Sequence, residues 1–162
     1  MFIDFRKLFG DNEQKRSYDF LFDFSKEDFI GCTVPKPVSG TVSFTWKDSA
    51  LAMKLSASAE IFYSCARCLE ETVKTVEISR EVSVRQANLN DNEEELPLDK
   101  NGCLDVKELV YTELVLKVPP VLLCSESCAG LCPVCGKKRE EGCLCDTQPE
   151  DSRLAVLKQL LS

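Results

Sequence analysis

Eight of the ten cysteines in this 162-residue chain fall into four close pairs, and this spacing constrains the fold more than any other feature. Two thiolates with one to three residues between them can point at one metal ion from a single tight turn. Two such pairs complete the four-coordinate shell that Zn²⁺ prefers in structural sites. We therefore predict two structural Zn²⁺ sites with four cysteine ligands each, drawn from Cys65, Cys68, Cys124, Cys128, Cys132, Cys135, Cys143 and Cys145.

The loop lengths favour one grouping of these four pairs. Seven residues separate the third pair (Cys132 and Cys135) from the fourth (Cys143 and Cys145), and short loops lose little entropy on closure. This grouping leaves the first pair to share a long-range site with the second. The alternative joins the second pair to the third and the first to the fourth, and it stays open at this point. Cys32 and Cys103 stand alone and are expected to be buried, inert thiols.

The beginning of the chain carries charges at Asp4, Arg6 and Lys7 and no apolar run behind them, so we expect no export signal. No stretch approaches the roughly 18 apolar residues of a membrane span. We therefore expect a cytoplasmic protein without membrane contact. In that reducing compartment, clustered cysteines indicate metal ligands first and redox groups second.

The composition excludes several classes of active site. The chain contains no histidine, which removes Cys₂His₂ fingers, histidine-ligated catalytic zinc and His-activated nucleophiles. No paired carboxylates or phosphate-binding loop stand out, so we expect a protein that is not an enzyme. The formal net charge of −7 disfavours nucleic-acid binding through the overall field. A local contact with RNA or a partner remains open for Lys137, Lys138 and Arg139, although such a run can equally be a solvated turn.

Alternation of apolar and polar residues predicts four strands, at 18–24, 42–46, 51–63 and 76–84. Gly31 to Gly40, with two prolines, is expected to be a loop or an edge, and the acidic stretch 87–102 a solvated loop. The first cysteine pair lies between the last two strands. It is therefore expected at the tip of a long antiparallel hairpin.

Two helices are expected in the C-terminal part. Asp105 can cap the first, with Glu108 completing a capping box and Pro119-Pro120 ending the helix. The second is expected to begin at Asp151 or Ser152. The fold class is then α+β: a twisted antiparallel sheet or partial β-barrel with a cysteine-rich zinc-binding segment and two helices. We expect a β-rich body over 1–118 and a zinc-binding segment with its helix over 119–162, packed together as one domain.

The order of these motifs resembles the YceD family of bacterial proteins, which is linked to accumulation of large-subunit ribosomal RNA. The resemblance runs from about residue 38 to the C-terminus, and the cysteine string is its most specific part. It is carried by Cys65-Ala66-Arg67-Cys68-Leu69, Leu104-Asp105-Val106, Val118-Pro119-Pro120, Leu123-Cys124, the string from Cys128 to Gly136, Cys143-Leu144-Cys145 and the stretch from Asp151 to Leu157.

The resemblance implies a non-enzymatic role in ribosome biogenesis. The partner would be precursor large-subunit ribosomal RNA or its assembling particle, contacted directly or through a protein. Two other functions compete with this hypothesis. One is a redox enzyme or sensor that uses Cys65 and Cys68, and the other is a zinc-ribbon module for protein interactions.

Overall fold

A four-stranded antiparallel sheet with the order β2-β3-β4-β5 forms the largest part of the computed structural model, which describes residues 1–10, 15–47, 50–85, 96–139 and 143–145. Within those residues β2 and β5 are the two edges, so the sheet is open and does not close into a barrel. With its helices and cysteine-rich segment the protein is α+β, as predicted. The strands are β2 (Lys15–Phe22), β3 (Val38–Lys47), β4 (Ala50–Ser64) and β5 (Glu71–Val84).

The alternation that predicted β4 also determines which face of the sheet is buried. Leu51, Met53, Leu55 and Ile61 are at most 2% exposed, whereas Lys54 on the opposite face is exposed. Period-two alternation places successive side chains on opposite faces, so one face packs into the core. β5 pairs with β4 along its whole length, with Leu51 opposite Val84 and Ser64 opposite Glu71. Their hairpin is therefore long, and its tip comprises residues 65–70.

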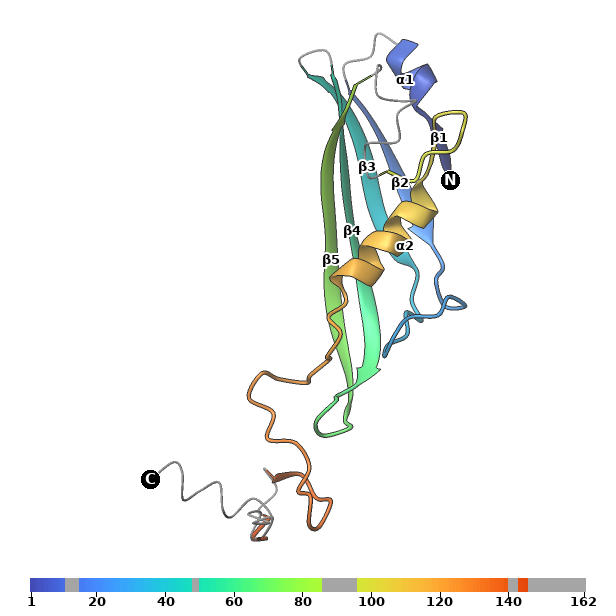
Figure 1. The fold of residues 1–162 in the computed structure, drawn as a ribbon. Coiled ribbons are helices and arrows are strands. Elements are labelled where there is room, and N and C mark those ends of the chain that lie inside the picture. The colour runs from blue at the N-terminus through green and yellow to red at the C-terminus, as the bar shows by residue number, and fades with distance from the viewer. Residues whose placement is uncertain (11–14, 48–49, 86–95, 140–142, 146–162) are drawn as a thin grey trace, which may run out of the picture.

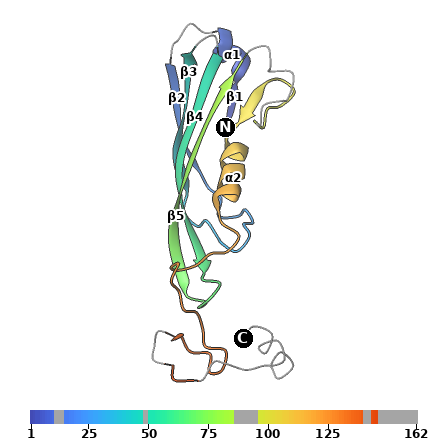
Figure 2. The ribbon, with the colours of Figure 1, turned by 60° about the vertical axis from the view of Figure 1, so that its left-hand side comes forward.

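Helix α2 (Val106–Lys117) lies across one face of the sheet, as Figures 1 and 2 show. Asp105 is its N-cap, as predicted, and the carboxylate accepts a hydrogen bond from the Lys107 N–H at 2.9 Å. The helix ends before Pro119 and Pro120, which cannot donate backbone hydrogen bonds. The predicted apolar stripe is buried and consists of Val106, Leu109, Val110 and Leu114.

Three N-terminal features were not predicted. β1 (Phe2–Asp4) pairs with β6 (Cys103–Asp105) in a two-stranded antiparallel sheet, and α1 (Phe5–Gly10) follows β1 directly. The amino group of Met1 also lies 3.7 Å from the Asp105 carboxylate. The first ten residues are thus attached to the start of α2. β3 also begins at Val38, so the end of the expected 31–40 loop belongs to the sheet.

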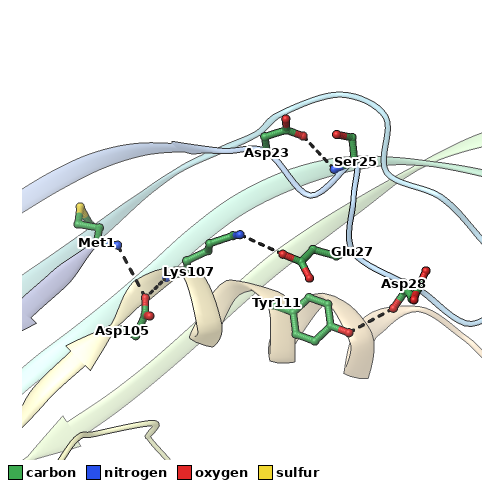
Figure 3. A network of polar contacts seen from close by, with 8 residues as sticks. All are labelled: Met1, Asp23, Ser25, Glu27, Asp28, Asp105, Lys107 and Tyr111. Atoms are coloured by element: carbon green, nitrogen blue, oxygen red, sulfur yellow. Dashed lines mark hydrogen bonds and ion pairs between the residues drawn. The ribbon is translucent and has the colours of Figure 1, made fainter.

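Polar contacts attach the loop after β2 to α2 (Figure 3). The Lys107 ammonium lies 3.0 Å from the Glu27 carboxylate, and the Tyr111 hydroxyl donates to the Asp28 carbonyl at 3.2 Å. Exposed ion pairs contribute little individually, so these contacts orient the loop more than they stabilise the fold.

A more buried ion pair joins the sheet to α2. The Arg80 guanidinium of β5 contacts the Glu113 carboxylate, and their side chains are 16% and 8% exposed. Among the described residues, no helix has the length and apolarity that crossing a membrane requires. The predicted C-terminal helix and most of the predicted acidic loop lie outside the described residues, and the predicted division of the chain at residue 118 stays a prediction.

Candidate metal centres

Four cysteines from two distant parts of the chain meet at the tip of the β4–β5 hairpin. We call Cys65, Cys68, Cys124 and Cys128 the first quartet, and all their Sγ atoms lie within 4.8 Å of one another. The Cys65–Cys128 and Cys68–Cys124 sulfur distances are 3.9 and 3.6 Å. A tetrahedral ion with Zn–S bonds of about 2.3 Å requires sulfurs about 3.8 Å apart. The first quartet therefore has the spacing of a four-thiolate metal site.

The remaining paired cysteines form a second group further along the segment that follows α2. Cys132, Cys135, Cys143 and Cys145, the second quartet, also have all Sγ atoms within 4.8 Å of one another. The Cys135 and Cys143 sulfurs are 3.5 Å apart. The structure thus adopts the grouping that short loops favour. In Figures 1 and 2 residues 124–139 and 143–145 lie at and beyond the hairpin tip.

The two Cys-x-x-Cys turns have the same local hydrogen bonds to sulfur. The Arg67 N–H donates to Cys65 Sγ at 3.4 Å, and the Val134 N–H donates to Cys132 Sγ at the same distance. A hydrogen bond to the charged form of a group stabilises that form. Both turns are thus built to hold a thiolate at their first cysteine.

The residue that follows each turn adopts a left-handed backbone conformation. Gly136 has φ 71° and donates its N–H to the Cys132 carbonyl, and Leu69 has φ 61° and donates to the Cys65 carbonyl. Glycine adopts positive φ without steric cost, whereas a side chain with a Cβ does so at a cost. Leu69 is 66% exposed, so burial of its side chain does not offset this strain.

Backbone donors favour ionisation of one thiol in each quartet. The backbone N–H of Cys124, aided by those of Cys68 and Arg67, lowers the pKa of Cys65 to about 6. The N–H groups of Cys135 and Val134 likewise lower the pKa of Cys132 to about 6.

The neighbouring thiols oppose further ionisation. Hydrogen bonding with Cys143 and Cys135 raises the pKa of Cys145 to about 12, and contact with Cys128 is the main cause of the raised pKa of Cys124. Four thiolates this close repel one another unless a cation lies among them. The donor set therefore fits a divalent ion that prefers sulfur, and such an ion would convert the remaining thiols to thiolates.

Arg67 joins the hairpin tip to the segment after α2. Its guanidinium donates to the backbone carbonyls of Glu126 and Cys128 at 3.3 and 3.0 Å, and its own carbonyl accepts from the Leu131 N–H at 3.1 Å. Gly130 packs directly on it, because a Cβ at that position would lie 3.1 Å from the Arg67 carbonyl oxygen. No sequence pattern singled out Arg67 or Gly130 for this role.

Two further contacts support the first quartet. The Ala66 N–H donates to the Leu122 carbonyl at 2.9 Å, and the Tyr63 hydroxyl donates to the Leu123 carbonyl at 2.9 Å. These bonds align the chain just before Cys124 with the base of the hairpin tip. The first quartet is therefore a continuation of the sheet and not an appendage to it.

The predicted basic run lies on the turn of the second quartet. Lys137 and Arg139 are exposed and Lys138 is half-buried. The Lys138 ammonium lies 3.0 Å from the Glu70 carboxylate of the hairpin tip. The run is therefore near both quartets, and its contact with RNA or a partner stays a prediction.

The two remaining cysteines belong to neither quartet. Cys32 is buried, as predicted, and burial raises the pKa of its thiol. Cys103 lies in β6 and is half-buried, so the expectation of a fully buried thiol is wrong there.

Fold and site together define an α+β protein whose long hairpin is attached to a C-terminal segment with two four-cysteine clusters able to bind metal ions. The family model described as large ribosomal RNA subunit accumulation protein YceD matches residues 53–161, about two-thirds of the chain. This chain belongs to the YceD family. The match includes all eight paired cysteines. Neither the curated proteins nor the solved structures gave a match.

Proposed function

We propose that this protein is a non-enzymatic ribosome biogenesis factor that promotes accumulation or processing of large-subunit ribosomal RNA in the cytoplasm. Two structural Zn²⁺ ions would hold its C-terminal segment on the β4–β5 hairpin. The observation that carries the proposal is the match of the family model across the hairpin and both quartets. The family's description is the basis for the role in ribosomal RNA accumulation. The two quartets are the basis for the proposed stabilisation by metal.

The donor sets support zinc with a structural role. Each quartet offers four thiolates, and sites built from four cysteines are closed, with no position left for water or substrate. The metal would therefore contribute folding free energy rather than chemistry. The first quartet would tie the hairpin tip to the chain about 56 residues later, from Cys68 to Cys124. Arg67 and Tyr63 already align those two parts of the backbone.

The geometry around Cys65 and Cys68 disfavours the redox alternative. Their turn joins two antiparallel strands, and it does not precede a helix whose N-terminus would stabilise a reactive thiolate. Cys65 is fully buried, and the pair is matched by Cys124 and Cys128 instead of facing solvent. Such an arrangement suits metal ligation better than disulfide exchange with another protein.

Depletion of the protein in its own cell tests the proposal. We expect less mature large-subunit ribosomal RNA relative to small-subunit RNA, together with a deficit of large subunits in ribosome profiles. Expression of the unaltered chain should restore both. Unchanged RNA and ribosome profiles would contradict the proposed function. Purification of the tagged protein provides a second test, because recovery of RNA polymerase without ribosomal particles would favour a zinc-ribbon interaction module instead.

A further inference from the structure

The two quartets differ sharply in how far solvent reaches their sulfurs. In the first quartet Cys65, Cys68 and Cys128 are 0%, 7% and 6% exposed, Cys124 is half-buried, and the apolar side chains of Leu123 and Leu131 pack against the buried thiols. In the second quartet Cys132 alone is buried; Cys135 is exposed, and Cys143 and Cys145 are half-buried. An oxidant or a chelator in solution therefore meets the sulfurs of the second quartet first.

The exposed thiol of the second quartet also has a partner for a disulfide. Cys135 Sγ lies 3.5 Å from Cys143 Sγ, and only seven residues separate the two cysteines. A disulfide requires the sulfurs to approach to about 2.05 Å, a movement of about 1.5 Å. Both cysteines lie outside the strands, so this movement does not require the sheet to be displaced. The similar approach of Cys68 to Cys124 lies between the hairpin and the segment after α2, and there Cys68 is buried and Cys124 half-buried, so neither thiol is as open to solvent as Cys135.

We propose that the second quartet is an oxidation-sensitive metal site, in which hydrogen peroxide converts Cys135 and Cys143 to a disulfide and releases the metal while the first quartet keeps its own. This inference rests on the metal binding in the proposed function. It adds a reversible chemical response confined to one of the two sites.

The chemistry balances with peroxide as the two-electron oxidant. The Cys135 thiolate attacks one peroxide oxygen, the O–O bond breaks, and a sulfenic acid and hydroxide form. The Cys143 thiolate then attacks the Cys135 sulfur, forming the S–S bond and displacing a second hydroxide. Two thiolates lose two electrons in total, and peroxide is reduced to two hydroxides. Only Cys132 and Cys145 then remain as ligands, which is too few to retain the ion against a competing chelator.

The contacts of Arg67 confine the effect to the second quartet. The Arg67 bonds to Glu126, Cys128 and Leu131 do not involve the second quartet, so they persist when its metal leaves. The hairpin tip and the first quartet therefore stay joined. The part that changes is the turn that carries Lys137, Lys138 and Arg139, the residues predicted to contact RNA or a partner. Oxidation would thus alter the contact surface without unfolding the sheet.

The test uses the full-length protein purified under reducing conditions and then freed of reductant. Metal content is measured first, and hydrogen peroxide is then added in the presence of a chromophoric zinc chelator. We expect one metal ion per chain to be released at least about tenfold faster than the second. Mass spectrometry of the peptides should find a disulfide between Cys135 and Cys143, and dithiothreitol with added Zn²⁺ should restore two ions per chain.

Controls separate this inference from the proposed function. The Cys32→Ser/Cys103→Ser variant lacks both cysteines outside the quartets and should release metal as the parent does. Release of both ions at the same rate, or a first disulfide within Cys65, Cys68, Cys124 and Cys128, would overturn the inference and leave the structural role of zinc intact. A protein that contains no metal before peroxide is added would overturn both the inference and the structural role of zinc.

Discussion

Leu69 and Gly136 occupy equivalent positions in two turns that share their hydrogen bonds, yet only one of them is a glycine. Each follows a Cys-x-x-Cys sequence, each has positive φ, and each donates its N–H to the carbonyl of the first cysteine. The comparison identifies Leu69 as a strained residue at the edge of the first quartet. The backbone of this turn is evidently determined by the cysteines and not by the preference of the residue at its end.

Substitution of Leu69 by glycine should therefore stabilise the protein. Relief of the left-handed strain yields about 1–2 kcal/mol, and the added flexibility of the unfolded chain offsets about 0.5–1 kcal/mol of this. We expect the free energy of unfolding to rise by about 0.5–1 kcal/mol in denaturant titrations. Leu69→Ala is the matched control, because it removes the exposed side chain and keeps the strain. Equal stabilisation by both variants would mean that strain is not the cause.

Single substitutions in the two quartets should have unequal effects on stability. Cys68→Ser removes a ligand that joins the hairpin to a distant segment, whereas Cys135→Ser opens a site closed within 14 residues of chain. Each variant should bind one metal ion per chain in elemental analysis. We expect Cys68→Ser to lower the melting temperature by about 10 °C or more and Cys135→Ser by about 3 °C or less. Equal melting temperatures would contradict the conclusion that the first quartet contributes more to stability than the second.

Loss of one partner of the Arg80–Glu113 ion pair should lower the free energy of unfolding, whereas replacement of both partners by apolar side chains should change it little. Glu113→Leu leaves the half-buried guanidinium without this carboxylate, and we expect a loss of about 2–3 kcal/mol in the free energy of unfolding. The double variant Arg80→Met/Glu113→Leu places apolar groups on both sides and should come within about 1 kcal/mol of the parent. Chemical denaturation of the parent, both single variants and the double variant completes a double-mutant cycle. Additive effects would show that the pair does not couple β5 to α2.

The basic run offers a test of direct RNA contact. If Lys137, Lys138 and Arg139 each neutralise a phosphate, their joint replacement by serine should weaken binding to precursor large-subunit RNA. It should also reduce the slope of log K against log salt by about 3. The matched control replaces Lys26, Lys47 and Lys54 by serine, which changes the net charge equally at exposed positions elsewhere. Equal weakening in both variants would indicate a general charge effect, and no weakening would place the contact elsewhere or in a partner protein.

The strands, the helix and the grouping of the cysteines could be predicted because each leaves a strong local pattern. The alternation of apolar and polar residues over many positions predicted β4. Asp105 and the two prolines predicted the ends of α2. The seven-residue loop between the third and fourth cysteine pairs predicted the second quartet. The short β1 and β6 could not be predicted, since three residues carry too little periodicity and their pairing spans most of the chain.

The details of the site depended on tertiary contacts that sequence does not reveal. Arg67 looks like any exposed basic residue until its guanidinium is seen to bond two backbone carbonyls. Leu69 gave no sign of positive φ because leucine rarely adopts it. Gly130 is required by the approach of the Arg67 backbone, and that approach exists only once the hairpin tip meets the segment after α2.

The metal content of the full-length protein, purified without chelator and measured by elemental analysis alongside native mass spectrometry, tests the central claim most directly. The account predicts two zinc ions per chain and a native mass that exceeds the polypeptide mass by two zincs less the displaced protons. Protein that is folded, reduced and free of metal would contradict it.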